Sequence, residues 1–186
     1  MKCKWFLTPS RVLGLLVTLP VAAGLLACAT PEAGHGGSMS SAGQDQMNTA
    51  WTNYVAAWNN HDPAAIASAF LPDGYINSPV TGGPARGEAI TQYAGGTFSG
   101  FPDFKLEIVN RQQTDHGYAD EWVMRGSWSG TFAGGPLKGV APSGKPFVVY
   151  GSSFLEYENG KLKSENIYFD RMSLLAQIGA LPPTMK

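Results

Sequence analysis

The stretch that decides the fold is residues 147–170, FVVYGSSFLEYENGKLKSENIYFD. At its centre lies Asn159-Gly160, a pair typical of two-residue hairpin turns, because both turn positions require a positive φ. The runs on either side are rich in β-branched and aromatic residues. The stretch therefore predicts an antiparallel β-hairpin.

Pairing Glu158 with Lys161 would set the register of this hairpin, and with it the side chains that share a face. One face is then charged and includes Glu165. The other face holds Val149, Gly151, Ser153, Leu155, Leu162, Ser164, Asn166, Tyr168 and Asp170. Because these residues are mostly apolar or small, they either pack against another layer or line a cavity, and the carboxylate of Asp170 at the far end favours the cavity.

The elements before and after this hairpin predict an α+β fold. Apolar residues recur at helical spacing from Met47 to Trp58, and Asp62-Pro63 is typical of the start of a second, short helix. A third short helix is expected at residues 88–93, strands at 104–109 and 118–131, and a closing helix at 173–177. Helices followed by antiparallel strands indicate a strongly curved sheet, mixed or antiparallel, wrapped around the N-terminal helices.

The first 27 residues predict export. Three basic residues, Lys2, Lys4 and Arg11, precede an apolar run over residues 12–27 that is short and interrupted for a membrane span. The run ends in Leu-Leu-Ala-Cys at residues 25–28, which resembles the box of bacterial lipoprotein signals. This resemblance implies that Cys28 becomes the lipidated first residue of the mature chain. The alternative is an ordinary secretory signal. The residue after the cysteine, Ala29, favours the outer membrane if the cell has one.

Residues 28–44 predict a flexible tether, because they offer almost nothing to bury. The domain would then span residues 45–186, a common size for one hydrophobic core. Removal of the signal would take three of the 13 basic residues and none of the 14 acidic ones, leaving a formal charge near −4. No basic cluster survives to hold phosphates, which argues against a nucleic-acid partner.

Short motifs along the domain resemble the SnoaL-like polyketide and ester cyclases of the nuclear-transport-factor-two-like superfamily. They lie at residues 58–62, 70–74, 101–103, 130–132, 142–145, 159–162, 170 and 174–179. The resemblance implies a cone-shaped sheet around a deep apolar pocket. In such cyclases a pocket carboxylate acts as general acid and base for an intramolecular aldol closure, without metal or cofactor.

The resemblance assigns the catalytic role to Asp170. Burial beside aromatic residues would raise the pKa of this carboxyl towards neutrality, as proton exchange requires. Asn77 is expected to stabilise the enolate oxygen. The other expected substrate contacts are Tyr168, Ser153, Asn166, Tyr75, Trp58, Trp122 and Trp128. The cyclases carry histidine at the place of Ser153, and serine is a poor proton shuttle.

Three functions remain open from the sequence. The first is a lyase or isomerase acting on a small apolar carbonyl compound, and the second is binding of such a compound without turnover. The third is an interaction module that pairs into a homodimer through the open face of the sheet. Two roles also stay open for single residues, since Asp170 could serve only as a helix N-cap and Asn77 could hold a turn. We expect two partners, a small apolar ligand and the membrane, which the chain reaches through lipid on Cys28. We expect no metal or cofactor.

Overall fold

The computed structural model describes residues 40–181. The expected export signal and Cys28 lie outside the described residues. Within residues 40–181, none of the helices has the length and apolarity needed to cross a membrane.

The two N-terminal helices begin at side-chain caps. Helix α1 spans Ser41–Asn59, with Ser40 as N-cap, so the helix occupies the last residues of the stretch expected as tether. Helix α2 spans Pro63–Ser68, and the carboxylate of Asp62 accepts a hydrogen bond from the backbone N–H of Ala65 at 2.9 Å. The cap predicted from Asp62-Pro63 is thus confirmed, because an N-terminal N–H needs an acceptor outside the helix.

Three elements follow before the long strands. Strand β1 spans Phe70–Asn77, β2 spans Ala85–Arg86 and α3 spans Glu88–Gly100. Residues 71–74 lie within β1, where the pairing is irregular between Phe70 and Tyr75. Helix α3 is also longer than the predicted helix at 88–93.

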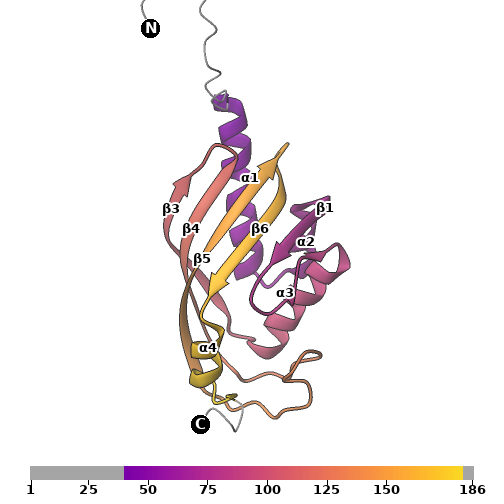
Figure 1. The fold of residues 1–186 in the computed structure, drawn as a ribbon, viewed down its shortest axis with the longest axis vertical. Coiled ribbons are helices and arrows are strands. Elements are labelled where there is room, and N and C mark those ends of the chain that lie inside the picture. Colours follow the sequence, from indigo (N-terminus) through magenta and orange to yellow (C-terminus); the bar gives the residue numbers. More distant parts are fainter. Residues whose placement is uncertain (1–39, 182–186) are drawn as a thin grey trace, which may run out of the picture. The chain divides into compact units, whose positions relative to one another are not determined.

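Six strands form one mixed sheet. The later elements are β3 (Lys105–Gln113), β4 (Gly117–Ser127), β5 (Pro146–Glu158), β6 (Lys161–Phe169) and α4 (Arg171–Gln177). The strand order is β2-β1-β6-β5-β4-β3, in which only β1 and β6 are parallel. The sheet is curved and unclosed, and α1 lies against it while α4 sits at the end of β5 and β6 (Figure 1). The α+β expectation is confirmed.

The hairpin of β5 and β6 has the predicted turn but a shifted register. Asn159 and Gly160 have φ values of 51° and 72°, and Glu158 pairs with Lys161. Tyr157 then pairs with Leu162, whereas Glu156 pairs with Ser164, so Lys163 is an extra residue on β6. Such a β-bulge exchanges the two faces of the strand beyond it. The strict alternation expected from the sequence was therefore wrong after Lys163.

The core lies between the helices and the inner face of the sheet. Tyr54 of α1 packs edge-on against Trp58 and Phe70, with ring centroids 6.4 and 5.7 Å apart. Gly151 leaves room for the indole of Trp122, because a Cβ at this position would clash with its Cη2 atom. The sheet can therefore carry a large aromatic side chain on its inner face without losing its pairing.

Candidate active site

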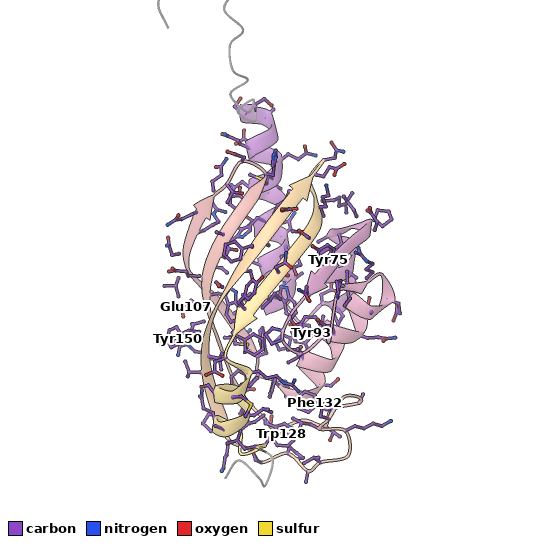
Figure 2. All side chains as sticks on the ribbon, in the orientation of Figure 1. Tyr75, Tyr93, Glu107, Trp128, Phe132 and Tyr150 are labelled. Atoms are coloured by element: carbon purple, nitrogen blue, oxygen red, sulfur yellow. The ribbon has the colours of Figure 1, made fainter. Side chains whose placement is uncertain are left out.

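A cavity of about 1290 Å³ lies between the inner face of the sheet, helices α1, α3 and α4, and the loop over residues 128–145. Its walls are mainly apolar, with aromatic side chains that include Trp58, Tyr93, Phe104, Trp122, Trp128 and Phe132. Trp128 and Phe132 lie near each other at the lower end of the molecule, and Tyr93 lies above them (Figure 2). The volume and walls suit an apolar organic ligand.

Glu165 is a buried carboxylate on the wall of this cavity. Glu165 is 5% exposed, and its Oε2 atom accepts a hydrogen bond from the hydroxyl of Tyr54 at 2.5 Å. Burial raises the pKa of Glu165 to about 7; hydrogen bonds from Tyr54 and Ser153 oppose this rise, and the nearby charge of Asp120 adds to it. A carboxyl group with such a pKa can both take and return a proton near neutral pH.

Ser153 connects Glu165 to the neighbouring strand. Its Oγ atom accepts a hydrogen bond from the indole Nε1–H of Trp122 at 2.9 Å. Because that contact uses the oxygen as acceptor, the hydroxyl hydrogen remains available to Glu165, whose pKa the serine lowers. Ser153 therefore keeps a hydroxyl hydrogen free at the place where the resemblance implies a histidine.

Two tyrosines beside Glu165 stay protonated at neutral pH. Burial and the charge of Glu165 raise the pKa of Tyr54 well above its ordinary value. Burial also raises the pKa of Tyr93 to about 12, although a hydrogen bond with Ser78 opposes the rise. Both hydroxyls are therefore hydrogen-bond donors on the cavity wall.

A second buried carboxylate, Asp120, lines the same cavity from β4. It lies opposite Ser153 in the β4–β5 pairing and is 3% exposed. Its Oδ2 atom accepts a hydrogen bond from the indole Nε1–H of Trp51 at 2.7 Å. Burial raises the pKa of Asp120, while this hydrogen bond and the charge of Arg111 lower it.

Four of the expected contact residues line the cavity. Trp58 comes from α1, Trp122 from β4, Ser153 from β5, and Trp128 from the segment after β4. All four are buried. The structure therefore brings these residues together around one space, in agreement with their expected position.

The other expected site residues lie outside the cavity. Asp170 is exposed, and its carboxylate caps α4 by accepting a hydrogen bond from the backbone N–H of Ser173 at 3.0 Å. Its expected position in the pocket was wrong, because the bulge at Lys163 reverses the faces of β6. The N-cap alternative matches the observed geometry.

The same reversal moves Asn166 and Tyr168 to the outer face of the sheet. Tyr168 is 57% exposed and packs edge-on against Phe154, and the side chain of Asn166 accepts a hydrogen bond from Asn77 at 3.4 Å. Tyr75 lies beside the guanidinium of Arg86, which is 4.7 Å from its ring centre. Neither Asn77 nor Tyr75 reaches the cavity. All four were expected as substrate contacts, and the structure places them elsewhere.

Sequence reasoning missed Glu165 and Asp120 as site residues, although a signal for Glu165 was present. Apolar residues of β6 change parity along the strand, from Leu162 to Ile167 and Phe169. An inward face can contain all three only if one residue is inserted between them, as in a β-bulge. Asp120 offered no comparable signal, because its burial depends on the packing of α1.

Within the part of the chain that the structure describes, no three His, Cys, Asp or Glu side chains come together as a metal site. The polar side chains of the cavity include the carboxylate of Glu165, which accepts from the hydroxyl of Tyr54, and the hydroxyl of Ser153, which accepts from the indole N–H of Trp122. Their chemistry is that of proton exchange and hydrogen bonding.

The comparisons with known proteins agree with this geometry. The profile of the SnoaL-like polyketide cyclases matches residues 48–178. IdmH from Streptomyces antibioticus, a candidate polyketide cyclase, is 26% identical, with a TM-score of 0.58 over 72% of this chain and 99% of its own. A protein with a ketosteroid isomerase-like fold from Catenulispora acidiphila, solved in complex with trimethylamine, is 25% identical, with a TM-score of 0.57 over 72% of this chain and 93% of its own.

A candidate SnoaL-like polyketide cyclase from Jannaschia is 17% identical, with a TM-score of 0.64 over 78% of this chain and all of its own, which establishes a common fold. None of the curated proteins compared with the chain matches it significantly. The fold supports a function of the cyclase or isomerase type, or ligand binding. Because the family profile covers most of the described residues, the chain belongs to the SnoaL-like polyketide cyclase family.

Proposed function

We propose that this protein is a cofactor-independent cyclase or isomerase that moves a proton on an apolar carbonyl compound, with Glu165 as general acid and base. One observation supports the proposal above the others. Glu165 is a buried carboxylate on the wall of a large apolar cavity, and its pKa is about 7. Perturbed carboxyl groups in a cleft are typical of catalytic sites.

In the proposed reaction, the carboxylate of Glu165 removes a proton from a carbon next to the carbonyl of the bound compound. Negative charge then grows on the carbonyl oxygen, where a nearby donor lowers the energy of the enolate. Tyr93 can supply this donor, because it lines the cavity and remains protonated. Glu165 finally returns the proton, either to another carbon in an isomerisation or to the alkoxide formed in an aldol closure.

Tyr54 and Ser153 would position the acid and base. The hydroxyl of Tyr54 holds one oxygen of Glu165 at 2.5 Å, and Ser153 is itself fixed by the indole of Trp122 at 2.9 Å. A carboxyl group held by the hydroxyl of Tyr54 loses little rotamer freedom when the substrate binds, which favours a productive geometry.

Binding without turnover is the second candidate function. It is favoured by serine at position 153, since the hydroxyl of Ser153 accepts from Trp122 and cannot act as the proton shuttle that histidine provides. In that case Glu165 would only hydrogen-bond the ligand. The two candidates differ in whether protons exchange at the α-carbon.

The test is α-proton exchange in D₂O, measured by proton NMR on the full-length protein with a panel of aromatic and alicyclic ketones. If the protein is an enzyme, at least one ketone exchanges faster with wild type than with buffer, and Glu165→Gln removes that acceleration while ketone binding persists. Ketones that bind to wild type without any accelerated exchange would contradict the catalytic proposal and favour the passive pocket.

The pH dependence of this exchange follows from the pKa of Glu165. Proton abstraction needs the carboxylate form, so kcat/KM should rise as pH increases through about 7 and level off above it. The measurement is the exchange rate at low ketone concentration between pH 5 and pH 9, a range of about four units that brackets the expected midpoint. A flat profile, or a rise near the ordinary carboxyl range, would argue against Glu165 as the base.

We further propose that the protein is exported and anchored to the cell envelope through lipid on Cys28. The basic residues, the apolar run and the Leu-Leu-Ala-Cys ending support this. Intact-mass spectrometry of the protein from its native membrane should give a chain that begins at Cys28 and carries acyl groups. A chain that begins elsewhere, or lacks lipid, would refute the anchor.

A further inference from the structure

Asp120 has one carboxylate oxygen whose partner is missing. Its Oδ2 atom accepts from Trp51, but its Oδ1 atom is buried and forms no hydrogen bond within the described residues. Buried carboxylate oxygens are costly to leave without a donor, and most are satisfied by protein, water or ligand. The free oxygen therefore needs an explanation.

Arg111, whose positive charge acts on Asp120, does not satisfy this oxygen. The guanidinium of Arg111 lies over the rings of Trp51 and Tyr118, at 4.1 and 4.5 Å from their centres, and donates to the side chain of Asn48 at 2.9 Å. It lowers the pKa of Asp120 through space without a hydrogen bond to it. Arg111 thus favours the charged carboxylate and leaves Oδ1 free.

Tyr157 is the alternative partner within the protein. Its hydroxyl is also buried without a hydrogen bond, and burial together with the charges of Glu165 and Asp120 raises its pKa. The two unpartnered groups do not bond to each other in the structure. An experiment therefore has to distinguish Tyr157 from a ligand as the hydrogen-bond donor to Asp120.

The cavity contains few groups that would attract an anion. Among the described residues that line it, Arg171 is the only lysine, arginine or histidine, whereas Asp120 and Glu165 both lie on the wall. A ligand that brings a hydrogen-bond donor suits such a wall better than one that brings a carboxylate or phosphate.

We propose that Asp120 is a ligand-anchoring residue, whose free Oδ1 atom accepts a hydrogen bond from an O–H or N–H group of the compound in the cavity. The inference rests on the proposed function only in placing the ligand in this cavity. It narrows the substrate class to apolar carbonyl compounds that also carry a hydroxyl or N–H group. A site built around such a donor discriminates strongly against analogues that lack it.

The test compares 2-naphthol with 2-methoxynaphthalene, which has similar shape but no donor, by isothermal titration calorimetry on the full-length protein. Because a hydrogen bond to a charged acceptor is strong, wild type should bind 2-naphthol about 10- to 100-fold more tightly than 2-methoxynaphthalene. In Asp120→Asn, the amide oxygen must stay with the indole N–H of Trp51, so the amide NH₂ takes the free position. The preference for naphthol should then disappear or reverse.

Tyr157→Phe is the matched control, since it removes the competing donor and leaves Asp120 intact. The preference for naphthol should persist in this variant. Three results would overturn the proposal: equal binding of both probes to wild type, a full naphthol preference in Asp120→Asn, or loss of the preference in Tyr157→Phe. Near-ultraviolet circular dichroism checks that each variant keeps its packed core. This binding comparison does not depend on turnover, so its failure differs from a failure of catalysis by Glu165.

Discussion

Glu165→Gln is expected to lower the enzymatic rate of α-proton exchange by about 10²- to 10⁴-fold, the usual contribution of a general acid or base. Glutamine matches glutamate in size, and its amide oxygen can still accept the hydroxyl of Tyr54. The amide cannot accept a proton from carbon. Ketone binding should consequently stay within about threefold of wild type, because the apolar walls that contribute most of the affinity are unchanged.

Asp170→Asn is the matched control for that variant. It removes a carboxylate five residues away along the chain, at an exposed position, and asparagine is as good an N-cap as aspartate. Exchange should therefore remain at the wild-type rate. Catalysis by Glu165 would be contradicted if Glu165→Gln exchanged at the wild-type rate, or if Asp170→Asn lost activity instead.

The second large effect concerns stability against pH. The pKa of Glu165 is about 7 in the folded protein and 4.5 for the unperturbed group. A group whose folded pKa is raised contributes stability that is present below its unfolded pKa and lost as pH rises through its folded pKa. As pH rises from 4.5 to 7, this one carboxyl should lower the free energy of unfolding by about 3 kcal/mol, at about 1.36 kcal/mol for each pH unit.

Glu165→Gln cannot ionise and should escape this loss. The quantity to compare is the free energy of unfolding of the variant minus that of wild type, measured by urea titration. This difference should be about 3 kcal/mol larger, in favour of the variant, at pH 8 than at pH 4. Other ionisable groups cancel in the comparison, because both proteins carry them. A difference that does not change with pH would mean that Glu165 ionises in the folded protein as readily as in the unfolded chain.

Most of the fold could be predicted from local sequence signals. Asp62-Pro63 identifies the start of α2, and Asn159-Gly160 identifies the turn of the last hairpin, because each depends on backbone chemistry within a few residues. The four expected contact residues that line the cavity, Trp58, Trp122, Trp128 and Ser153, precede the bulge at Lys163.

Glu165, the proposed acid and base, could not be identified from a strict alternation of inward and outward side chains along β6. One inserted residue, Lys163, exchanges the faces of β6, so Glu165 turns inward and Tyr168 turns outward. The charged neighbours of Glu165 in the sequence favour a solvated face, and only the change of parity from Leu162 to Ile167 indicates otherwise. The burial of Asp120 depends on Trp51, which is 69 residues distant along the chain.

The most direct measurement is the titration of Glu165 itself, from the difference infrared spectra of wild type and Glu165→Gln in the carboxyl region as pH is varied. The expected result is a carboxyl group in the wild-type spectrum that ionises near pH 7 and is missing from the variant. Ionisation of Glu165 near its ordinary value of 4.5 would contradict a buried acid and base on the cavity wall.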